Sequence, residues 1–413
     1  MAKKAEIKKR IFVAMSGGVD SSVAALLLKT QGYDVVGVFM KFWADSQSIS
    51  GANENRCCSL EARRDAMAVC AKLKIPFLTW DFQKEFKRAV VNDFISGYKK
   101  GITPNPCVIC NREIKLGFFL KKALKIGADC VAAGHYVRLV ERKNFTPSTR
   151  FARPACSLAC SSARSSPTTG RGDHARSPRN STQLSLRGSP AQVSESKIFS
   201  LLAAKDKNKD QSYFLWTLTQ EQLKHCLFPI GDYLKSEVRQ IAKKAGLLVA
   251  LKKESQEVCF VRDKDLYGFL KTRIKQKKGE IIELKTGKKL AEHQGAQFYT
   301  IGQRVPIGGT GPYYVGNKDL KKNQLLVVKK DAQGFFRKEI ILKNVNWISG
   351  EPSKSAKILV RTRYRQLLAT TSIEYQVSSI KLVFDKPQRF IAPGQSAVFY
   401  NREGELLGGG VIM

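Results

Sequence analysis

The chain has 413 residues, of which 43% are hydrophobic, and this is enough for packed cores in two or three domains. Lysine and arginine total 71 against 35 aspartate and glutamate residues, and the formal net charge of +36 favours a polyanionic partner, most commonly a nucleic acid. The sequence near Met1 has neither a membrane-spanning apolar stretch nor the pattern of a signal peptide, so we expect a cytoplasmic protein.

The first part of the chain alternates apolar strands with helices. Strands are predicted at 11–15, 34–42, 75–82 and 128–136, and helices at 20–32, 59–74, 83–100 and 113–127. Asp20 and the serines beside it are expected to begin the first helix, and Ser59 to cap the second. This alternation predicts a parallel sheet covered by helices on both faces.

The composition changes abruptly between Asn144 and Ser196. Serine, proline and threonine dominate there, and every basic side chain except His174 is arginine. No helical or strand periodicity is visible, so we predict a disordered insertion in a surface loop. An arginine-rich segment that folds on RNA is the alternative interpretation.

The remainder of the chain is rich in strands. A helix at 233–246 precedes strands predicted at 324–330, 339–348, 356–365, 371–384 and 397–401. These strands predict a small antiparallel barrel. The expected domains are 1–262, interrupted by the insertion 144–196, then a glycine-rich linking domain at 263–330 and the barrel at 331–413.

The stretch MSGGVDSS follows the first strand directly and begins the first helix. Backbone N–H groups converge at such a helix start, where the helix dipole favours an anion, and two glycines permit close backbone approach. Serine hydroxyls add further donors. The stretch lacks the lysine of a Walker A loop and is not G-x-G-x-x-G. It therefore predicts a phosphate-binding loop of another type.

Cysteine is the second feature with chemical meaning. The chain has ten cysteines and only four widely separated histidines, so neither a disulfide framework nor a histidine-rich zinc site is expected. Cys107 and Cys110 lie in GITPNPCVICNREIK near a predicted helix start, where a thiolate is stabilised, and Cys259 lies in SQEVCF. A C-x-x-C pair fits a redox pair, half of a metal site or a sulfur-handling nucleophile. The other cysteines are interpreted as structural: Cys57, Cys58, Cys70, Cys130, Cys156, Cys160 and Cys226.

These motifs resemble a known family. SGGVDS is similar to the PP-loop of ATP pyrophosphatases, and the cysteine motifs are similar to those of bacterial tRNA-specific 2-thiouridylases. Further stretches match that family and occur in the same order: AGHY, KDQSYFLW, FPIGDYLKSEVR, YTIGQR, TRYRQ, PGQSAVFYN and LGGGVI. The resemblance covers nearly the whole chain outside the insertion. The resemblance implies an α/β PP-loop domain of the adenine nucleotide α-hydrolase type, a small linking domain and a C-terminal antiparallel β-barrel.

The resemblance also implies site residues. ATP would contact Ala14, Met15, Ser16, Gly17, Gly18, Val19, Asp20, Ser21, Met40 and Gly134. The target base would contact Asn105, Pro106 and Cys107. The tRNA would contact His135, Lys209, Asp210, Gln211, Arg363, Tyr364 and Gln395. Cys259 would hold the persulfide sulfur, and Cys110 would be the nucleophile that forms a disulfide with it.

The implied function is ATP-dependent formation of 2-thiouridine at the wobble position of tRNA, with magnesium accompanying ATP. The sulfur donor would be a cysteine desulfurase or a relay protein. Two other functions are considered: a different PP-loop adenylating enzyme, such as an amidotransferase-type synthetase, and a non-catalytic RNA-binding protein with a decayed ATP site.

Cys107 departs from the family pattern, because many members have aspartate at this position and a thiol cannot take over its acid–base or ligand role. Three cysteines in one pocket would also suit an iron–sulfur cluster with an open iron position. A metal-free persulfide relay is preferred, because cluster motifs usually have closer cysteine spacing.

Overall fold

The structure is a computed structural model that describes residues 8–43, 59–146, 194–253, 258–261, 265–308, 311–329, 336–353 and 356–413. Most of the insertion predicted at 144–196 lies outside these ranges, as do Cys57, Cys58, Cys156 and Cys160. Contacts divide the chain into one unit, 1–141 with 199–413, and a second unit, 142–198. The first unit contains the site described below. No helix among the described residues is long and apolar enough to cross a membrane.

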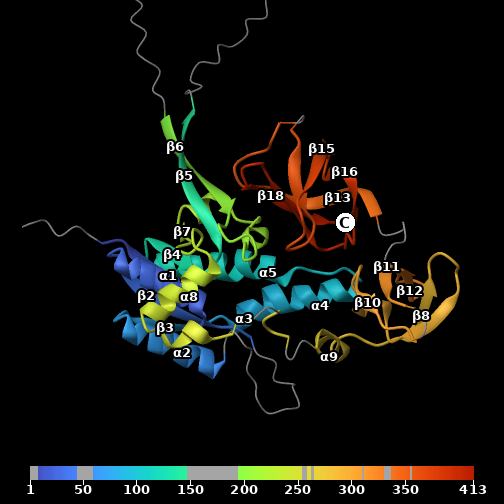
Figure 1. Ribbon diagram of the computed structural model, residues 1–413, viewed down its shortest axis with the longest axis horizontal. Helices are drawn as coiled ribbons and strands as arrows, with labels where there is room; N and C mark the ends of the chain where they lie inside the picture. The colour runs from blue at the N-terminus through green and yellow to red at the C-terminus, as the bar shows by residue number, and fades with distance from the viewer. Residues whose placement is uncertain are drawn as a thin grey trace, which may run out of the picture. The chain divides into compact units, whose positions relative to one another are not determined.

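A five-stranded parallel sheet organises the first domain (Figure 1). Its strand order is β3-β2-β1-β4-β7, with β1 at Arg10–Met15, β2 at Asp34–Lys41, β3 at Phe77–Asp81, β4 at Cys130–Ala133 and β7 at Cys226–Leu227. The order reverses between β1 and β4, so the carboxyl ends of these two strands form the crevice where open α/β sheets bind ligands.

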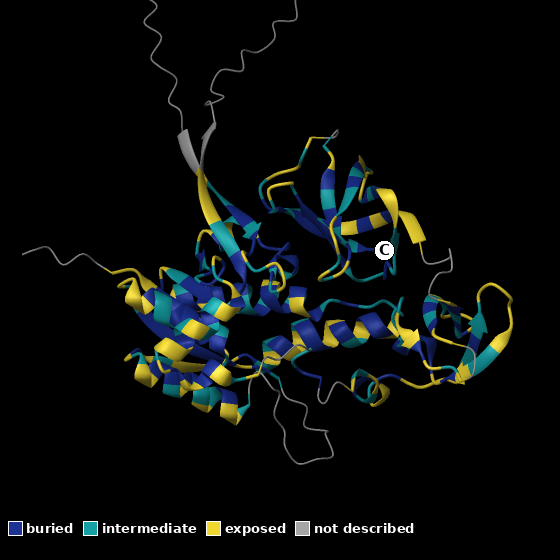
Figure 2. Cartoon of the chain, in the orientation of Figure 1, coloured by how far each residue is buried: buried dark blue, intermediate teal, exposed yellow. Residues whose placement is uncertain are grey.

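Helices cover both faces of this sheet, as predicted. Ile11, Val13 and Met15 of β1 pack in one core with α1 (Val19–Thr30), α2 (Leu60–Lys72) and α8 (Lys235–Lys244). Phe12 and Ala14 point into the other core. Its helical segments are α3 (Gln83–Phe86), α4 (Asn92–Lys99), α5 (Pro106–Ile109) and α6 (Phe119–Lys125), with π-helical turns η1 (Lys87–Val91) and η2 (Cys110–Phe118). Figure 2 shows the resulting alternation of buried and exposed positions.

Both predicted helix starts are confirmed, but the two helices are capped differently. Ser59 caps α2 as predicted, because its side chain accepts a hydrogen bond from Ala62 N. Asp20 lies in the first turn of α1, as predicted, and the capping residue is Gly18, which has no side chain to accept a hydrogen bond. The hydroxyls of Ser21 and Ser22 donate back to Gly18 O instead, at 3.2 and 2.8 Å.

The linking segment forms a sheet of its own, preceded by α9 (Leu266–Lys271). The strand order is β10-β11-β12-β8-β9. The bounds are β8 Gly279–Glu283, β9 Lys289–His293, β10 Arg304–Val305, β11 Tyr313–Asp319 and β12 Gln324–Lys329. The strand predicted at 324–330 therefore belongs to this sheet and not to the barrel.

The C-terminal strands close into an antiparallel barrel, as predicted. Their order is β13-β16-β15-β14-β17-β18, and pairing of β13 with β18 completes the ring. The bounds are β13 Phe336–Trp347, β14 Ile358–Arg361, β15 Ala369–Tyr375, β16 Ile380–Arg389, β17 Ser396–Tyr400 and β18 Glu405–Ile412. The single stretch predicted at 371–384 covers most of β15 and the first half of β16, which are two separate strands.

Two strands on either side of the insertion were not predicted. β5 (Val137–Thr146) and β6 (Ser194–Ala203) are neighbours in the sheet that contains the barrel strands. Leu201 and Leu202 of β6 pair with β18. The first unit also contains short helical segments: η3 (Ser212–Phe214), α7 (Gln220–Leu223), η4 (Leu248–Leu251) and η6 (Ala296–Phe298).

Replacing residues 147–193 by a turn of about six residues should leave the fold intact, because β5 and β6 are already adjacent. The connection becomes about eightfold shorter, and loop-closure entropy predicts about 2 kcal/mol of added stability. Thermal unfolding of the deletion variant tests this expectation, and limited proteolysis of the full chain should cut first within 147–193. A folded deletion variant that no longer binds RNA would favour the alternative interpretation of an RNA-binding segment.

Candidate active site

One cavity of about 340 Å³ lies at the carboxyl ends of β1, β2 and β4. Most of the site residues expected from the sequence line it together: Ala14, Met15, Ser16, Asp20, Ser21, Met40, Pro106, Cys107, Cys110, Gly134, His135, Gln211 and Cys259. Four expected site residues adjoin these in the chain but do not line the cavity: Gly17, Gly18, Val19 and Asn105. Five residues expected to contact tRNA do not line it either: Lys209, Asp210, Arg363, Tyr364 and Gln395.

The phosphate-binding loop is folded by its own serines. Ser16 N donates to Ser21 Oγ at 3.2 Å, and the two hydroxyls lie 3.1 Å apart. Gly17 has φ +69°, and a Cβ there would collide with the carbonyl of Ala62 in α2. A Cβ on Gly134, which follows β4, would lie 2.7 Å from Ser21 N. Glycine therefore permits two close backbone approaches, that of the loop to α2 at Gly17 and that of the residue after β4 to the start of α1 at Gly134.

Asp20 is held by two groups that were not predicted from the sequence. Its Oδ1 accepts hydrogen bonds from Tyr136 Oη at 2.8 Å and from Lys235 Nζ at 2.6 Å. The Lys235 side chain is only 11% exposed and lies at the start of α8. A nearly buried ammonium therefore balances the only carboxylate in the described lining of the cavity.

Three cysteines meet in the cavity from two segments of the chain. Cys107 lies in α5, whose first turn contains Pro106 and is capped by Asn105, and Cys110 begins η2. Cys259 comes from residues 258–261. Among the described residues, no group of three or more His, Cys, Asp and Glu side chains is arranged to hold a metal ion.

The thiols of Cys107 and Cys110 are protonated at neutral pH. Cys107 is exposed to the cavity, but the surrounding walls and Cys259 raise its pKa to about 11. Burial raises the pKa of Cys110 to about 12, and Lys115 opposes this rise. Burial therefore opposes the thiolate that the sequence led us to expect at this helix start.

Two buried polar atoms in the lining have no hydrogen-bond partner among the described residues: His135 Nδ1 and Asn111 Oδ1. Burial and the charge of Lys115 lower the pKa of His135 to about 3, so its ring is neutral at physiological pH. Buried polar groups are usually paired, and these two atoms therefore fit a cavity that receives a polar ligand.

Two of the residues expected to contact tRNA are engaged inside the protein. The buried carboxylate of Asp210 accepts hydrogen bonds from Ala204 N and Ser212 N and lies 3.4 Å from an Arg361 nitrogen. Gln395 Nε2 donates to the carbonyls of Thr103 and Pro104, at 2.9 and 3.3 Å. These contacts position η3 and the loop before Asn105.

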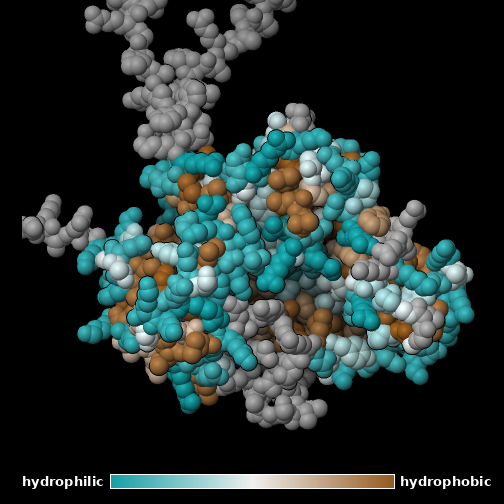
Figure 3. All heavy atoms as spheres, viewed as in Figure 1, coloured by the Kyte–Doolittle hydropathy of each residue, from teal (hydrophilic) through white to brown (hydrophobic). Residues whose placement is uncertain are grey.

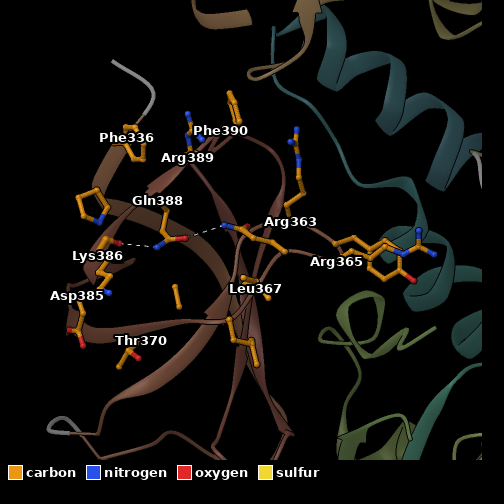
Figure 4. A pocket seen from close by; sticks show the side chains of 15 residues that line it. Phe336, Arg363, Arg365, Leu367, Thr370, Asp385, Lys386, Gln388, Arg389 and Phe390 are labelled. Atoms are coloured by element: carbon orange, nitrogen blue, oxygen red, sulfur yellow. Dashed lines mark hydrogen bonds between the residues drawn. The ribbon is translucent and has the colours of Figure 1, made fainter. Parts of the chain in front are cut away.

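Arg363 and Tyr364 line a second hollow, of about 800 Å³, on the barrel. Figure 4 shows Arg363, Arg365 and Arg389 around it together with exposed apolar side chains. The Tyr364 ring lies 4.6 Å from that of Phe214, which lines the cavity with the cysteines. Hydrophilic side chains predominate on the face shown in Figure 3. An aromatic contact therefore joins one wall of this hollow to a wall of the cavity.

Known proteins give this arrangement its context. Family models match residues 9–155 and 182–263 (tRNA methyl transferase HUP domain), 267–329 (tRNA methyl transferase PRC-barrel domain) and 337–412 (aminomethyltransferase beta-barrel domain). The chain is 40% identical to tRNA-specific 2-thiouridylase MnmA 2 of a Thermoanaerobacter species, over 98% of each chain. It is 38% identical to MnmA of Clostridioides difficile over 98% of each chain, and 39% identical to that of Vibrio cholerae over 99% of this chain and 97% of the relative. The chain belongs to the MnmA family of tRNA-specific 2-thiouridylases.

Proposed function

We propose that this protein is a cytoplasmic, ATP-dependent tRNA sulfurtransferase that forms 2-thiouridine at the wobble position. The proposal rests on one observation above all: the phosphate-binding loop and three cysteines line the same cavity. The family models are named after methyl transfer, but thiols beside a phosphate-binding loop fit adenylation and sulfur transfer better.

The first step is activation of the base. Uridine O2 attacks the α-phosphate of ATP, pyrophosphate leaves, and the C2–O bond becomes a phosphate ester. The backbone N–H groups after β1 and the hydroxyls of Ser16 and Ser21 would hold the phosphates. Met40 and Gly134 would contact the nucleoside. Magnesium would bind through the phosphates, since a dedicated carboxylate cage is not found in the described lining.

The second step is transfer of sulfur from a Cys259 persulfide. In one route the outer sulfur attacks C2 and AMP leaves, after which the Cys110 thiolate attacks Cys259 Sγ and releases the thiolated base. In the other route Cys110 attacks first and frees hydrosulfide, which then attacks C2. Both routes end with a Cys110–Cys259 disulfide, and two electrons from an external dithiol restore the thiols.

The tRNA must present its base unstacked from the anticodon, as other base-modifying enzymes require. Asn105, Pro106 and Cys107 would contact the target base at the start of α5, and neutral His135 would donate or accept a hydrogen bond. Gln211 lies beside them, with its Oε1 accepting from Tyr136 N at 3.0 Å. Asp210 and Gln395 would act on tRNA through the loops that they hold. A cysteine desulfurase or relay protein would supply the persulfide sulfur.

Arg363→Ala and Lys209→Ala should each weaken tRNA binding without changing ATP binding, because neither residue lines the cavity. Removal of one phosphate contact should also reduce the slope of log K against log salt by about 0.9. Filter binding at several salt concentrations measures both effects. Lys343→Ala, which removes an exposed charge from β13, is the matched control. Equal damage to ATP binding would show that Arg363 and Lys209 do not form a separate tRNA surface.

A deletion strain tests the proposed function in cells. Loss of 2-thiouridine from its tRNA, restored by this gene, is the expected result. An unaffected 2-thiouridine level would instead favour a different PP-loop synthetase, which needs no Cys110 or Cys259, or a non-catalytic RNA-binding protein.

A further inference from the structure

The only lysine or arginine in the described lining of the cavity is Lys115. The other ionisable groups that face the cavity are Cys107, Cys110, Cys259, the neutral His135, and Asp20, which is paired with Lys235. All of the sulfur chemistry in the proposed function passes through thiolates or persulfide anions in this space. A single ammonium group in such a cavity has a large influence, because the surrounding protein screens charge far less than water does.

Local backbone geometry brings Lys115 to Cys110. In an ordinary α-helix a residue five positions later lies about 140° around the helix axis, on a different face. Cys110–Phe118 is π-helical, and this wider turn bonds residue i+5 to residue i, which brings the two residues much closer to the same side of the helix. The π-helical turn therefore brings Cys110 and Lys115 to the same side of the helix, and both residues line the cavity.

Gly117 makes this turn possible. A Cβ at position 117 would lie 2.6 Å from the carbonyl oxygen of Arg112, the residue five positions earlier. The clash is with backbone and cannot be relieved by turning a side chain. Glycine at 117 therefore permits the π-helical turn that positions the ammonium group of Lys115. Turns of this kind occur frequently at functional sites.

The electrostatic effect is consistent with this placement. Lys115 lowers the pKa of Cys107, of Cys110 and of His135, so its charge acts on all three side chains. Burial nevertheless leaves the pKa of Cys110 at about 12, so only a small fraction of this thiol is ionised near neutrality. Any further rise in the pKa of Cys110 would slow a step that needs the Cys110 thiolate.

We propose that Lys115 stabilises the Cys110 thiolate as it attacks the Cys259 persulfide. This inference rests on the proposed function. Cys110 gives its proton to water, its sulfur bonds to Cys259 Sγ, and the bond from Sγ to the outer sulfur breaks. The electron pair leaves with the outer sulfur, as hydrosulfide or on C2 of the base. Lys115 acts through Cys110 and is a positioning residue, not a group that bonds to substrate.

The test is the rate at which iodoacetamide alkylates Cys110 between pH 7 and 10, without ATP or tRNA. Mass spectrometry with fragmentation separates Cys110 from Cys107, and Cys130, which is influenced by Lys9 and Asp129, serves as the internal reference. Lys115→Met should lower the Cys110 rate about tenfold for each pKa unit gained and displace the profile to higher pH. Lys115→Arg should restore most of the rate, and Lys121→Met, an exposed lysine on α6, should match the wild type.

Gly117→Ala should lower the Cys110 rate with Lys115 still present. If Lys115→Met does not fold, Lys115→Gln replaces it in the comparison. Equal Cys110 rates in the wild type and the uncharged variant would overturn the proposal, and so would equal losses in Lys115→Met and Lys115→Arg. The alkylation assay does not depend on thiolation. The role proposed for Lys115 can therefore be disproved while wild-type 2-thiouridine formation is confirmed, and the proposed function can be disproved while the role of Lys115 is confirmed.

Discussion

Cys110→Ser and Cys259→Ser should each abolish 2-thiouridine formation, with losses of at least about a thousandfold, because a hydroxyl can neither hold a persulfide nor resolve one. Release of pyrophosphate from ATP should continue in both variants, since the phosphate-binding loop is unchanged. Cys107→Ser should retain activity within about tenfold, because two thiols are enough for the relay. Nucleoside analysis of tRNA incubated with each purified variant measures the effect.

The iron–sulfur alternative predicts another pattern for the same variants. Cys107→Ser would then lose activity together with the other two, and protein purified without oxygen would be brown, with iron and acid-labile sulfide in proportion to activity. Under the relay, neither the wild type nor Cys107→Ser contains stoichiometric iron. The disulfide itself offers a further check, since turnover without a reductant should stop with Cys110 and Cys259 linked.

Gly17→Ala should destroy the ATP site. The backbone at Gly17 has φ +69°, and the new methyl group would collide with the carbonyl of Ala62, so α2 or the loop must shift. We expect ATP affinity to fall at least a hundredfold and thiolation to fall with it, because the loop N–H groups lose their common direction. Isothermal titration with ATP gives the affinity.

Gly127→Ala is the control matched for backbone strain. Gly127 has φ +91°, but a Cβ there meets nothing within 4 Å. This variant should lose about 1 kcal/mol of stability from the left-handed backbone alone and keep its ATP affinity. Equal loss of ATP binding in both variants would mean that backbone strain, and not the contact between the loop and α2, accounts for the effect.

The sequence predicted the nucleotide-binding half of the fold well because its signals are local. The run Ile11–Met15, the two glycines and the helix after them form consecutive elements, and the alternation of strands and helices predicts the parallel sheet. The capping role of Ser59 was predictable for the same reason, since a helix cap depends on a residue only three positions away. The barrel was also predicted, because its strands follow one another with short turns between most of them.

Features that depend on distant contacts were not predicted. β5 and β6 lie on either side of the insertion, and β6 pairs with β18, about two hundred residues further along the chain. The π-helical turn at Cys110 has no clear periodic signal, although Gly117 in the middle of a helix could have suggested an irregular turn. Lys115 and Lys235 were therefore overlooked, although both lie within motifs that carry the family resemblance.

The roles of Asp210 and Gln395 show a different limit. The resemblance implies that both residues contact tRNA, but a sequence alone cannot separate contact with tRNA from support of the neighbouring loops. Only the structure shows that the carboxylate of Asp210 is buried and accepts hydrogen bonds from Ala204 and Ser212. We accordingly assign both residues a supporting role in the proposed function.

The most direct test of the proposed function is the stoichiometry of a reaction containing purified protein, unmodified tRNA, ATP with magnesium, a persulfide donor and a dithiol. We predict that 2-thiouridine at the wobble position, AMP and pyrophosphate form in equal amounts, and that omission of ATP or of the sulfur source abolishes the modified nucleoside. Formation of AMP and pyrophosphate without any 2-thiouridine, or of a methylated uridine in its place, would contradict the function proposed for this cavity.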